Sequence, residues 1–153
     1  MYPKIHLKAK LRKMFLGHKH PWVFSGAIER VKCDREKLHG KLATIYLDGQ
    51  FLAHGYYNNM SQIALRILSW KEDEKIDYDF FVRKISSAFE VRNRFVLNKD
   101  TTACRIVFAE SDFLPGFIVD KYNDLLVLQI HTLGAENLKE MFVKALIEVL
   151  NPK

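Results

Sequence analysis

A hairpin signal near the middle of the first half most constrains what this chain can fold into. Leu42–Leu47 and Gln50–Tyr57 are both compatible with strands, and the dipeptide Asp48–Gly49 separates them. Asp-Gly favours the left-handed backbone that a two-residue hairpin turn requires. We therefore expect an antiparallel pair here, with the rest of the first half arranged around it.

Shorter strand patterns surround this hairpin. Ile5–Ala9, Ala27–Lys32 and Ile63–Trp70 alternate between apolar and polar residues, which is typical of strands with one buried face. Asp34–Gly40 is polar and predicts a turn. Residues 1–70 are thus predicted to form a compact, mostly β, barrel-like module.

Two segments of the first half have less regular patterns. Lys10–His20 has mixed signals and predicts a loop or a short helical turn. Trp22–Phe24 follows Pro21, and proline is favoured at the first position of a helix, so we expect another helical turn there.

The second half begins after a charged break. Lys71–Lys75 reads KEDEK, and we interpret residues 71–76 as a linker. Asp77–Asn98 predicts a helix, with Asp77 as its N-cap. The apolar positions that recur at helical spacing are Phe80, Phe81, Ile85, Ala88, Phe89, Val91 and Phe95.

Strands and a second helix follow. Arg105–Ala109, Phe117–Asp120 and Leu125–His131 predict strands, and Glu136–Leu150 predicts an amphipathic helix. Residues 77–153 therefore predict a small α+β module of helix, antiparallel strands and helix. The fold class expected for the whole chain is α+β.

Charge is distributed unevenly along the chain. The net charge is +6, from 24 Lys and Arg against 18 Asp and Glu. Residues 1–70 hold 12 basic and 4 acidic residues, whereas residues 71–153 hold 12 and 14. Because net charge steers association toward opposite charge, an anionic partner is expected to bind the first half.

The stretch Lys4–Ile28 concentrates this positive charge and then becomes aromatic, with no acidic residue before Glu29. Cations beside aromatic rings are typical of nucleic-acid binding, since they contact phosphates and stack on bases. A solvated basic arm is the alternative interpretation. The residues predicted to contact RNA are Lys8, Lys10, Arg12, Lys13, Lys19 and Arg66 through charge, and Trp22 with Tyr56 or Tyr57 through stacking.

Signals for catalysis or metal binding are weak. His18 and His20 lack partner ligands at a characteristic zinc spacing, so we expect no metal site. Cys33 and Cys104 lie far apart, with no convincing base beside either, and are interpreted as reduced cysteines of a cytoplasmic protein. No nucleotide-binding motif occurs, and no apolar run is long enough for a transmembrane helix.

Glu110–Asp112 is a polar triplet between apolar segments. An acid/base pair is one interpretation. We favour a structural one, in which the carboxylates cap a turn or pair with Arg105, Lys121 or Arg94.

Three motifs together carry a family resemblance. They are HPWVFSGAI at His20–Ile28, GYYN at Gly55–Asn58 and RIVFAESD at Arg105–Asp112, the last followed by Leu114–Pro115–Gly116. In this order and spacing they resemble the N-terminal part of the SAM-dependent large-subunit ribosomal RNA methyltransferases of the RlmI type, which form 5-methylcytosine in 23S rRNA.

The resemblance implies a layout and a function. Residues 1–70 would be a PUA domain, a small β-barrel that binds RNA, here 23S rRNA. Residues 77–153 would be the start of a central α+β domain, whose next strand follows Pro152 in the family and leaves a sheet edge to be covered or paired. The catalytic Rossmann-like domain, with its SAM site and catalytic cysteines, would lie outside this chain. No catalytic residue and no cofactor of the chain itself are therefore expected, and methyl transfer by the chain alone is disfavoured.

The chain departs from the family pattern at three turns. Asn59 replaces a proline, and Phe113 and Asn123 replace glycines. Asn tolerates the left-handed backbone, whereas Phe113 indicates a different turn or an exposed contact. A separate hypothesis, a protein–protein or homodimerisation module, would use the apolar C-terminal helix and the open sheet edge.

Overall fold

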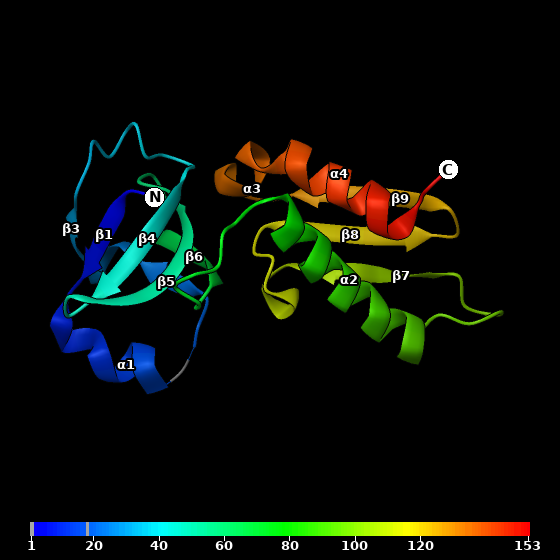
Figure 1. The fold of residues 1–153 in the computed structure, drawn as a ribbon, viewed down its shortest axis with the longest axis horizontal. Helices are drawn as coiled ribbons and strands as arrows, with labels where there is room; N and C mark the ends of the chain where they lie inside the picture. The colour runs from blue at the N-terminus through cyan, green and yellow to red at the C-terminus, as the bar shows by residue number, and fades with distance from the viewer. Residues whose placement is uncertain (1, 18) are drawn as a thin grey trace. The chain divides into compact units, whose positions relative to one another are not determined.

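The computed structural model describes residues 2–17 and 19–153. The chain divides into two compact units, Met1–Glu74 and Lys75–Lys153, each of which is described by itself (Figure 1). The predicted α+β class is confirmed, with a curled sheet in the first unit and helices packed on a smaller sheet in the second.

The first unit is a six-stranded curled sheet in the order β2-β6-β5-β4-β1-β3. Strand β1 pairs in parallel with β4, and the other neighbours are antiparallel. The strands are β1 Lys4–Leu7, β2 Trp22–Phe24, β3 Ile28–Val31, β4 Leu42–Leu47, β5 Gln50–Tyr57 and β6 Ile63–Ser69.

The β4–β5 hairpin forms as predicted. Asp48 and Gly49 both have positive φ, +52° and +76°, which is the backbone that a tight hairpin turn needs. Alternate residues of the strands point into one core, so the sheet closes around an apolar interior. The core includes Ile5, Leu7, Ala43, Ile45, Leu47, Ala53, Leu65 and Ile67.

Gly55 marks the tightest approach within this sheet. A Cβ atom built there would lie 2.3 Å from the backbone oxygen of Arg66. The pairing of β5 with β6 shifts register between His54 and Gly55, and the missing side chain allows this bulge to form.

Helical residues connect β1 to β2. The segment predicted as a loop or short helical turn forms a 3₁₀ turn, Ala9–Leu11, and a short helix α1, Arg12–Gly17. The helical turn predicted at Trp22–Phe24 is wrong: this segment is β2, because Val23 is fully buried and pairs with Leu65 of β6. Tertiary pairing overrides the local proline signal here.

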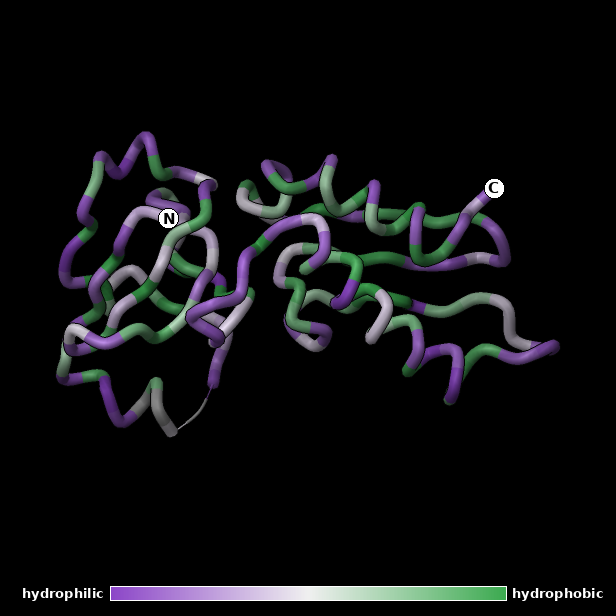
Figure 2. The backbone as a smooth tube through the Cα atoms, viewed as in Figure 1, coloured by the Kyte–Doolittle hydropathy of each residue, from purple (hydrophilic) through white to green (hydrophobic). Residues whose placement is uncertain are grey.

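The second unit packs helices on a three-stranded antiparallel sheet in the order β7-β8-β9. Green segments in Figure 2 show apolar residues along β8 and β9. The elements are α2 Tyr78–Phe95, β7 Ala103–Phe108, a 3₁₀ turn Ala109–Asp112, β8 Phe117–Tyr122, β9 Leu125–Ile130, α3 Leu133–Asn137 and α4 Lys139–Leu150.

Four phenylalanines hold α2, α4 and β8 together. The ring of Phe81 meets those of Phe80, Phe117 and Phe142 edge-on, at centroid distances of 5.3–5.9 Å. The rings of Phe117 and Phe142 stack at 4.0 Å. All four side chains are fully buried, so they form the centre of this core.

The predicted helices need adjustment at their ends. The Asp77 cap is confirmed, since its carboxylate accepts a hydrogen bond from the Phe80 N–H. The last turns of α2 leave Val91 and Phe95 exposed, contrary to the predicted apolar face. The single helix predicted at Glu136–Leu150 is instead α3 and α4, which are separated at Leu138.

Candidate nucleic-acid interface

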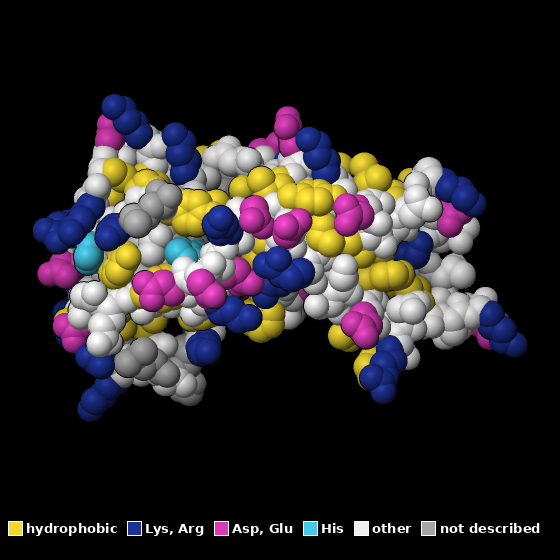
Figure 3. Space-filling view, viewed as in Figure 1, with side chains coloured by type: hydrophobic (Ala, Val, Ile, Leu, Met, Phe, Trp, Pro, Cys, Tyr) yellow, Lys and Arg dark blue, Asp and Glu magenta, His cyan; other side chains and the backbone are white. Residues whose placement is uncertain are grey.

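The basic segment of the first unit is attached to the sheet at its beginning. The Lys8 N–H donates to the Ala27 carbonyl at 3.0 Å, and Nζ of Lys8 donates to the Gly26 carbonyl at 2.8 Å. The 3₁₀ turn and α1 that follow are therefore held beside the end of β2. Lys10, Lys13 and Lys19 are exposed there. In Figure 3, dark-blue side chains surround the left-hand part of the view, where Figure 1 places β1 and α1.

Arg12 also joins α1 to the hairpin turn. Its Nη1 lies 2.8 Å from Oδ2 of Asp48, and both side chains are about half exposed to solvent, at 50% and 51%. Exposed pairs of this kind contribute about 0–1 kcal/mol. A phosphate can therefore compete with Asp48 for the guanidinium at small cost.

An aromatic corner lies at β2. The Trp22 N–H donates to Nδ1 of His20 at 3.1 Å, and the two rings meet edge-on at 5.5 Å. Trp22 is half-buried and pairs across the sheet with Arg66, which is also half-buried. The structure thus brings two of the predicted residues, one aromatic and one basic, onto neighbouring strands.

Phe24 is an exposed ring that the sequence interpretation did not include. Its side chain is 52% exposed, at the end of β2 and immediately before the turn whose Gly26 carbonyl accepts from Lys8. Alternation along a strand would have identified it, because Val23 points inward and Phe24 then points outward. The helical turn predicted for this segment concealed that signal.

The stacking role predicted for Tyr56 or Tyr57 does not fit the structure. The two side chains are 1% and 3% exposed, so neither offers a ring face to a base. Strand β5 lies between β4 and β6, and both of its faces are covered along these residues. Burial raises the pKa of Tyr57, partly offset by Arg35.

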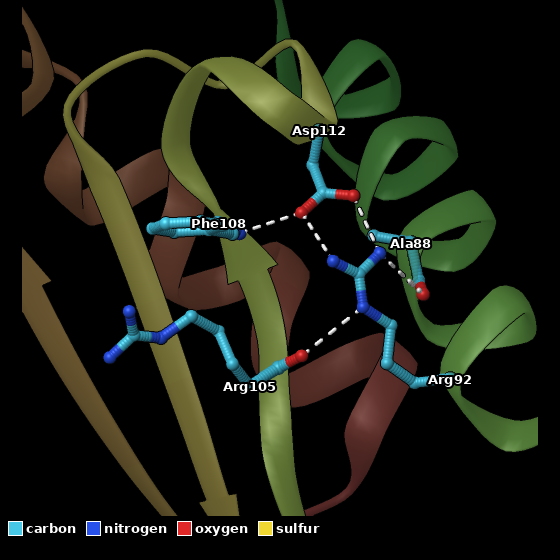
Figure 4. Close-up of polar contacts among 5 residues, drawn as sticks. All are labelled: Ala88, Arg92, Arg105, Phe108 and Asp112. Atoms are coloured by element: carbon cyan, nitrogen blue, oxygen red, sulfur yellow. Dashed lines mark hydrogen bonds and ion pairs between the residues drawn. The ribbon is translucent and has the colours of Figure 1, made fainter. Parts of the chain in front are cut away.

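Asp112 takes a structural position, as the favoured interpretation predicted, but with another partner. Its two oxygens accept from Nη1 and Nη2 of Arg92 at 2.6 and 2.7 Å, and Oδ2 accepts from the Phe108 N–H (Figure 4). Arg92 also donates through Nε to the Arg105 carbonyl at 3.1 Å. For Asp112 the partners suggested from sequence were wrong, and Arg105 pairs with Asp120 instead.

Metal-binding and nucleophilic groups do not converge in the described part of the chain. His18 lies outside the described residues, and no group of three His, Cys, Asp or Glu among those described could hold a metal ion. Cys33 and Cys104 are free thiols. Burial raises the pKa of Cys104, which disfavours the reactive thiolate, although Arg92 and Lys121 oppose this effect.

Among the helices that the structure describes, none has the length and apolar character needed to cross a bilayer.

Comparisons with known proteins agree with this architecture. Residues 5–70 match the family model of the PUA-like domain. Ribosomal RNA large subunit methyltransferase I of Vibrio cholerae serotype O1 is 43% identical over 148 residues, which cover 96% of this chain and 36% of that protein. The protein of the same name from Aliivibrio fischeri is 41% identical over 141 residues, covering 92% of this chain and 35% of that protein.

Solved structures show the same fold at low identity. A putative SAM-dependent methyltransferase from Streptococcus mutans gives a TM-score of 0.79 at 18% identity, over 95% of this chain and 37% of that one. A putative methyltransferase complexed with SAH gives 0.78 at 17% identity, over 95% of this chain and 36% of that one.

The chain spans only about a third of the length of the curated relatives that it matches. Within that span the resemblance predicted from the motifs is confirmed: residues 5–70 match the PUA-like domain, and the chain is similar to about a third of the length of the RlmI-type ribosomal RNA methyltransferases.

Proposed function

We propose that Met1–Glu74 binds structured RNA, specifically 23S rRNA in the cytoplasm, so that a SAM-dependent methyltransferase can reach a cytosine. The observation that carries this proposal is the set of exposed cations on the 3₁₀ turn and α1, fastened beside the aromatic end of β2. The PUA-like family match and the names of the relatives support it.

The cations would contact phosphates, which position RNA without reading its sequence. They are Lys8, Lys10, Arg12, Lys13 and Lys19, with Arg66 on the neighbouring strand. Trp22 would supply a ring edge beside Arg66, and Phe24 joins it as an exposed ring for an unpaired base. Tyr56 and Tyr57 are removed from this set by their burial.

Methyl transfer itself is assigned to residues outside 1–153. A neighbour was solved with SAH, so SAM is the methyl donor expected for the family. Residues 2–17 and 19–153 do not fit that group, because no strand described there is followed by a glycine-rich turn into a helix of the kind that holds a nucleoside cofactor.

The test is a salt series with a fragment of 23S rRNA and a duplex DNA control. Replacing Lys10, Arg12 and Lys13 together by Ala should weaken RNA binding. It should also make the slope of log binding constant against log salt concentration less steep by roughly 2. Lys99→Ala with Lys144→Ala, two exposed lysines of the second unit, provides the control. Unchanged binding by a folded triple variant would contradict the placement of the site.

A second candidate function rests on the uncovered face of the β7-β8-β9 sheet. Phe108, Tyr122, Leu125 and Val127 are all exposed large residues on these strands. The cross-strand pairs Asp120–Val127 and Tyr122–Leu125 place three of them on the same face. A second copy of the chain would bury this face, giving a homodimer.

Sedimentation at several concentrations distinguishes the two functions. If the face forms a dimer, Val127→Asp should dissociate it, whereas Val91→Asp, at an exposed position of α2, should not. A monomer at all concentrations would remove this second candidate.

A further inference from the structure

A row of side chains crosses the outer face of four strands in the first unit. Arg30 of β3 pairs with His6 of β1, His6 with Tyr46 of β4, and Tyr46 with Phe51 of β5. Ile5, Leu7, Ile45 and Leu47, their neighbours along the strands, are buried in the core. Because side chains alternate along a strand, these four residues, which we call the outer row, share the opposite face.

The aromatic members of the outer row contact one another. The rings of His6 and Tyr46 stack with centroids 5.4 Å apart and planes 23° apart. The ring of Tyr46 then meets Phe51 edge-on at 6.4 Å. All three side chains are half-buried, so the row presents a continuous, partly accessible ring surface.

Three cations surround these rings. Nζ of Lys4 lies 5.1 Å from the centroid of Tyr46, while Arg30 and Lys32 are exposed on β3 and just beyond its end. The Lys32 N–H donates to the Lys4 carbonyl, which keeps the two lysines adjacent. In the described part of the chain, none of the three cations is within ion-pair distance of a carboxylate.

The field of these cations converges on His6. Burial lowers the pKa of His6, and Lys32, Arg30 and Lys4 lower it further, whereas Glu29 opposes them. A neutral imidazole surrounded by three unneutralised cations marks a position where bound negative charge would be favourable.

The outer row also continues the basic segment on α1. Tyr46 and Phe51 flank the Asp48–Gly49 turn, and Asp48 is the carboxylate that holds Arg12. The row therefore begins where α1 is fastened to the hairpin and extends from there across β4 and β1 to β3.

We propose that the outer row is the second half of the RNA-binding surface and takes a single-stranded segment that runs from α1 over the β4–β5 turn. Lys4, Arg30 and Lys32 contact its phosphates, and Phe51 and Tyr46 contact its bases. A single strand fits because bases can reach these rings only when they are not stacked inside a duplex. The inference rests on the proposed RNA-binding function.

Substitution of the two exposed cations tests this inference. Arg30→Ala with Lys32→Ala should weaken binding of a single-stranded RNA of about 12 nucleotides. The slope of the logarithm of the binding constant against the logarithm of the salt concentration should also become less steep by roughly 1.4, the value for two lost phosphate contacts on a single strand. Lys99→Ala with Lys144→Ala removes the same charge from the second unit and should leave both quantities unchanged.

The outcomes separate this inference from the proposed function. If the Lys10→Ala/Arg12→Ala/Lys13→Ala variant loses RNA binding while Arg30→Ala/Lys32→Ala binds like the control, the RNA-binding surface ends at α1 and the inference is wrong. If both variants bind like the control, the proposed function fails as well. If a polyglutamate peptide competes as well as RNA of equal charge, the row is a general anion surface and the inference is overturned.

The imidazole of His6 gives a second readout, by NMR titration. Phosphates bound to Arg30, Lys32 and Lys4 would offset the cations that lower its pKa, so RNA should raise the pKa of His6. By linkage, RNA should bind more tightly as the pH falls through the range in which His6 titrates. An unchanged His6 titration in the RNA complex would place the RNA elsewhere.

Discussion

The two units of this chain differ in how their Lys and Arg side chains pair with carboxylates. In Lys75–Lys153, the cations that pair with carboxylates include Arg92, Arg105, Lys139 and Lys153. In Met1–Glu74, which carries the whole net charge of +6, Arg12 and Lys37 form exposed ion pairs, whereas Lys4, Arg30 and Lys32 lie beyond ion-pair distance of the described carboxylates. Charge that is already neutralised stabilises a fold, whereas charge left without an acidic partner attracts an anionic ligand.

The burial of the paired charges sharpens this contrast. The side chains of Arg92 and Asp112 are 18% and 10% exposed, and their two hydrogen bonds fasten α2 to the turn after β7. Arg12 and Asp48 are half exposed and can exchange partners. A similar ion pair is thus structural in one unit and replaceable in the other, and the predictions below compare a buried pair with an exposed one.

The largest effect is expected from Gly55→Ala. The new Cβ would meet the Arg66 backbone oxygen at 2.3 Å, and backbone cannot move aside as a flexible side chain can. We expect a loss of about 3 kcal/mol in the free energy of unfolding of the first unit. Urea unfolding followed by circular dichroism measures it.

Gly26→Ala is the matched control, because nothing lies within 4 Å of the Cβ that it would add. It should unfold like the wild type. If Gly55→Ala destabilised both units equally, the two units would unfold together. Their charges could then not be compared as those of two independent units.

Asp112→Ala should have an effect of similar size, within the second unit. It leaves the Arg92 guanidinium and the Phe108 N–H without the carboxylate that accepts from both. Breaking one side of a largely buried pair costs about 3 kcal/mol. Asp124→Ala, which removes the exposed pair with Lys153, should cost far less, because solvent screens that pair. Equal losses in thermal melts would mean that burial does not distinguish these pairs.

Acidification should affect the two units in different pH ranges. The hydrogen bond from Arg105 lowers the pKa of Asp120 in the folded state, so its stabilisation is present at neutral pH and is lost as the pH falls through that lowered pKa. The pKa of His6 is also lowered, and its contribution is lost earlier, as the pH falls below the ordinary histidine range near 6.5.

Two variants assign these losses. His6→Gln should flatten the dependence on pH just below neutrality, and Asp120→Asn should flatten it in the carboxylate range, each by about 1 kcal/mol or less. Urea midpoints measured from pH 7 to pH 3 provide the test. If His6→Gln left the pH dependence of the urea midpoint just below neutrality unchanged, the neighbouring cations would not influence the titration of His6.

The sequence predicted best those elements whose signals are local. The Asp48–Gly49 hairpin and the Asp77 cap follow from the conformational preferences of one or two residues, and both are found in the structure. The strand at Trp22–Phe24 was missed because its burial depends on β6, some 40 residues further along the chain. The proline signal at Pro21 favoured a helix, and the partner strand at such a distance in sequence could not be identified locally.

The candidate site was predictable only in its composition. The basic segment after β1 was evident from charge alone, but the burial of Tyr56 and Tyr57 depends on which strands flank β5. The outer row needed the register of four strands, since His6, Tyr46 and Phe51 lie in separate segments of the sequence. The partner of Asp112 likewise depends on how α2 packs on β7.

The smallest predicted effect concerns Phe113, which stands where the resembling family has glycine. Its φ is +58°, the left-handed backbone that glycine adopts freely, and Asn123, the other replacement, has φ +55°. The turn is therefore of a kind that glycine would favour, and Phe113 adopts it as an exposed contact: Nζ of Lys84 lies 4.8 Å from its ring centroid. That contact is worth about 0.5–1 kcal/mol, which partly offsets the backbone strain.

Two substitutions at this position separate strain from contact. Phe113→Ala keeps the left-handed backbone and loses the ring, whereas Phe113→Gly loses both the ring and the strain. We expect the Gly variant to be more stable than the Ala variant by about 1 kcal/mol. Relative to the wild type, Phe113→Gly should change the free energy of unfolding by less than about 0.5 kcal/mol. Relief of backbone strain stabilises this variant, whereas loss of the Lys84 contact and the higher entropy of its unfolded chain destabilise it by a similar amount. If the Ala and Gly variants were equally stable, the backbone at position 113 would be unstrained. The contact between the Phe113 ring and Lys84 would then form without any cost in backbone strain.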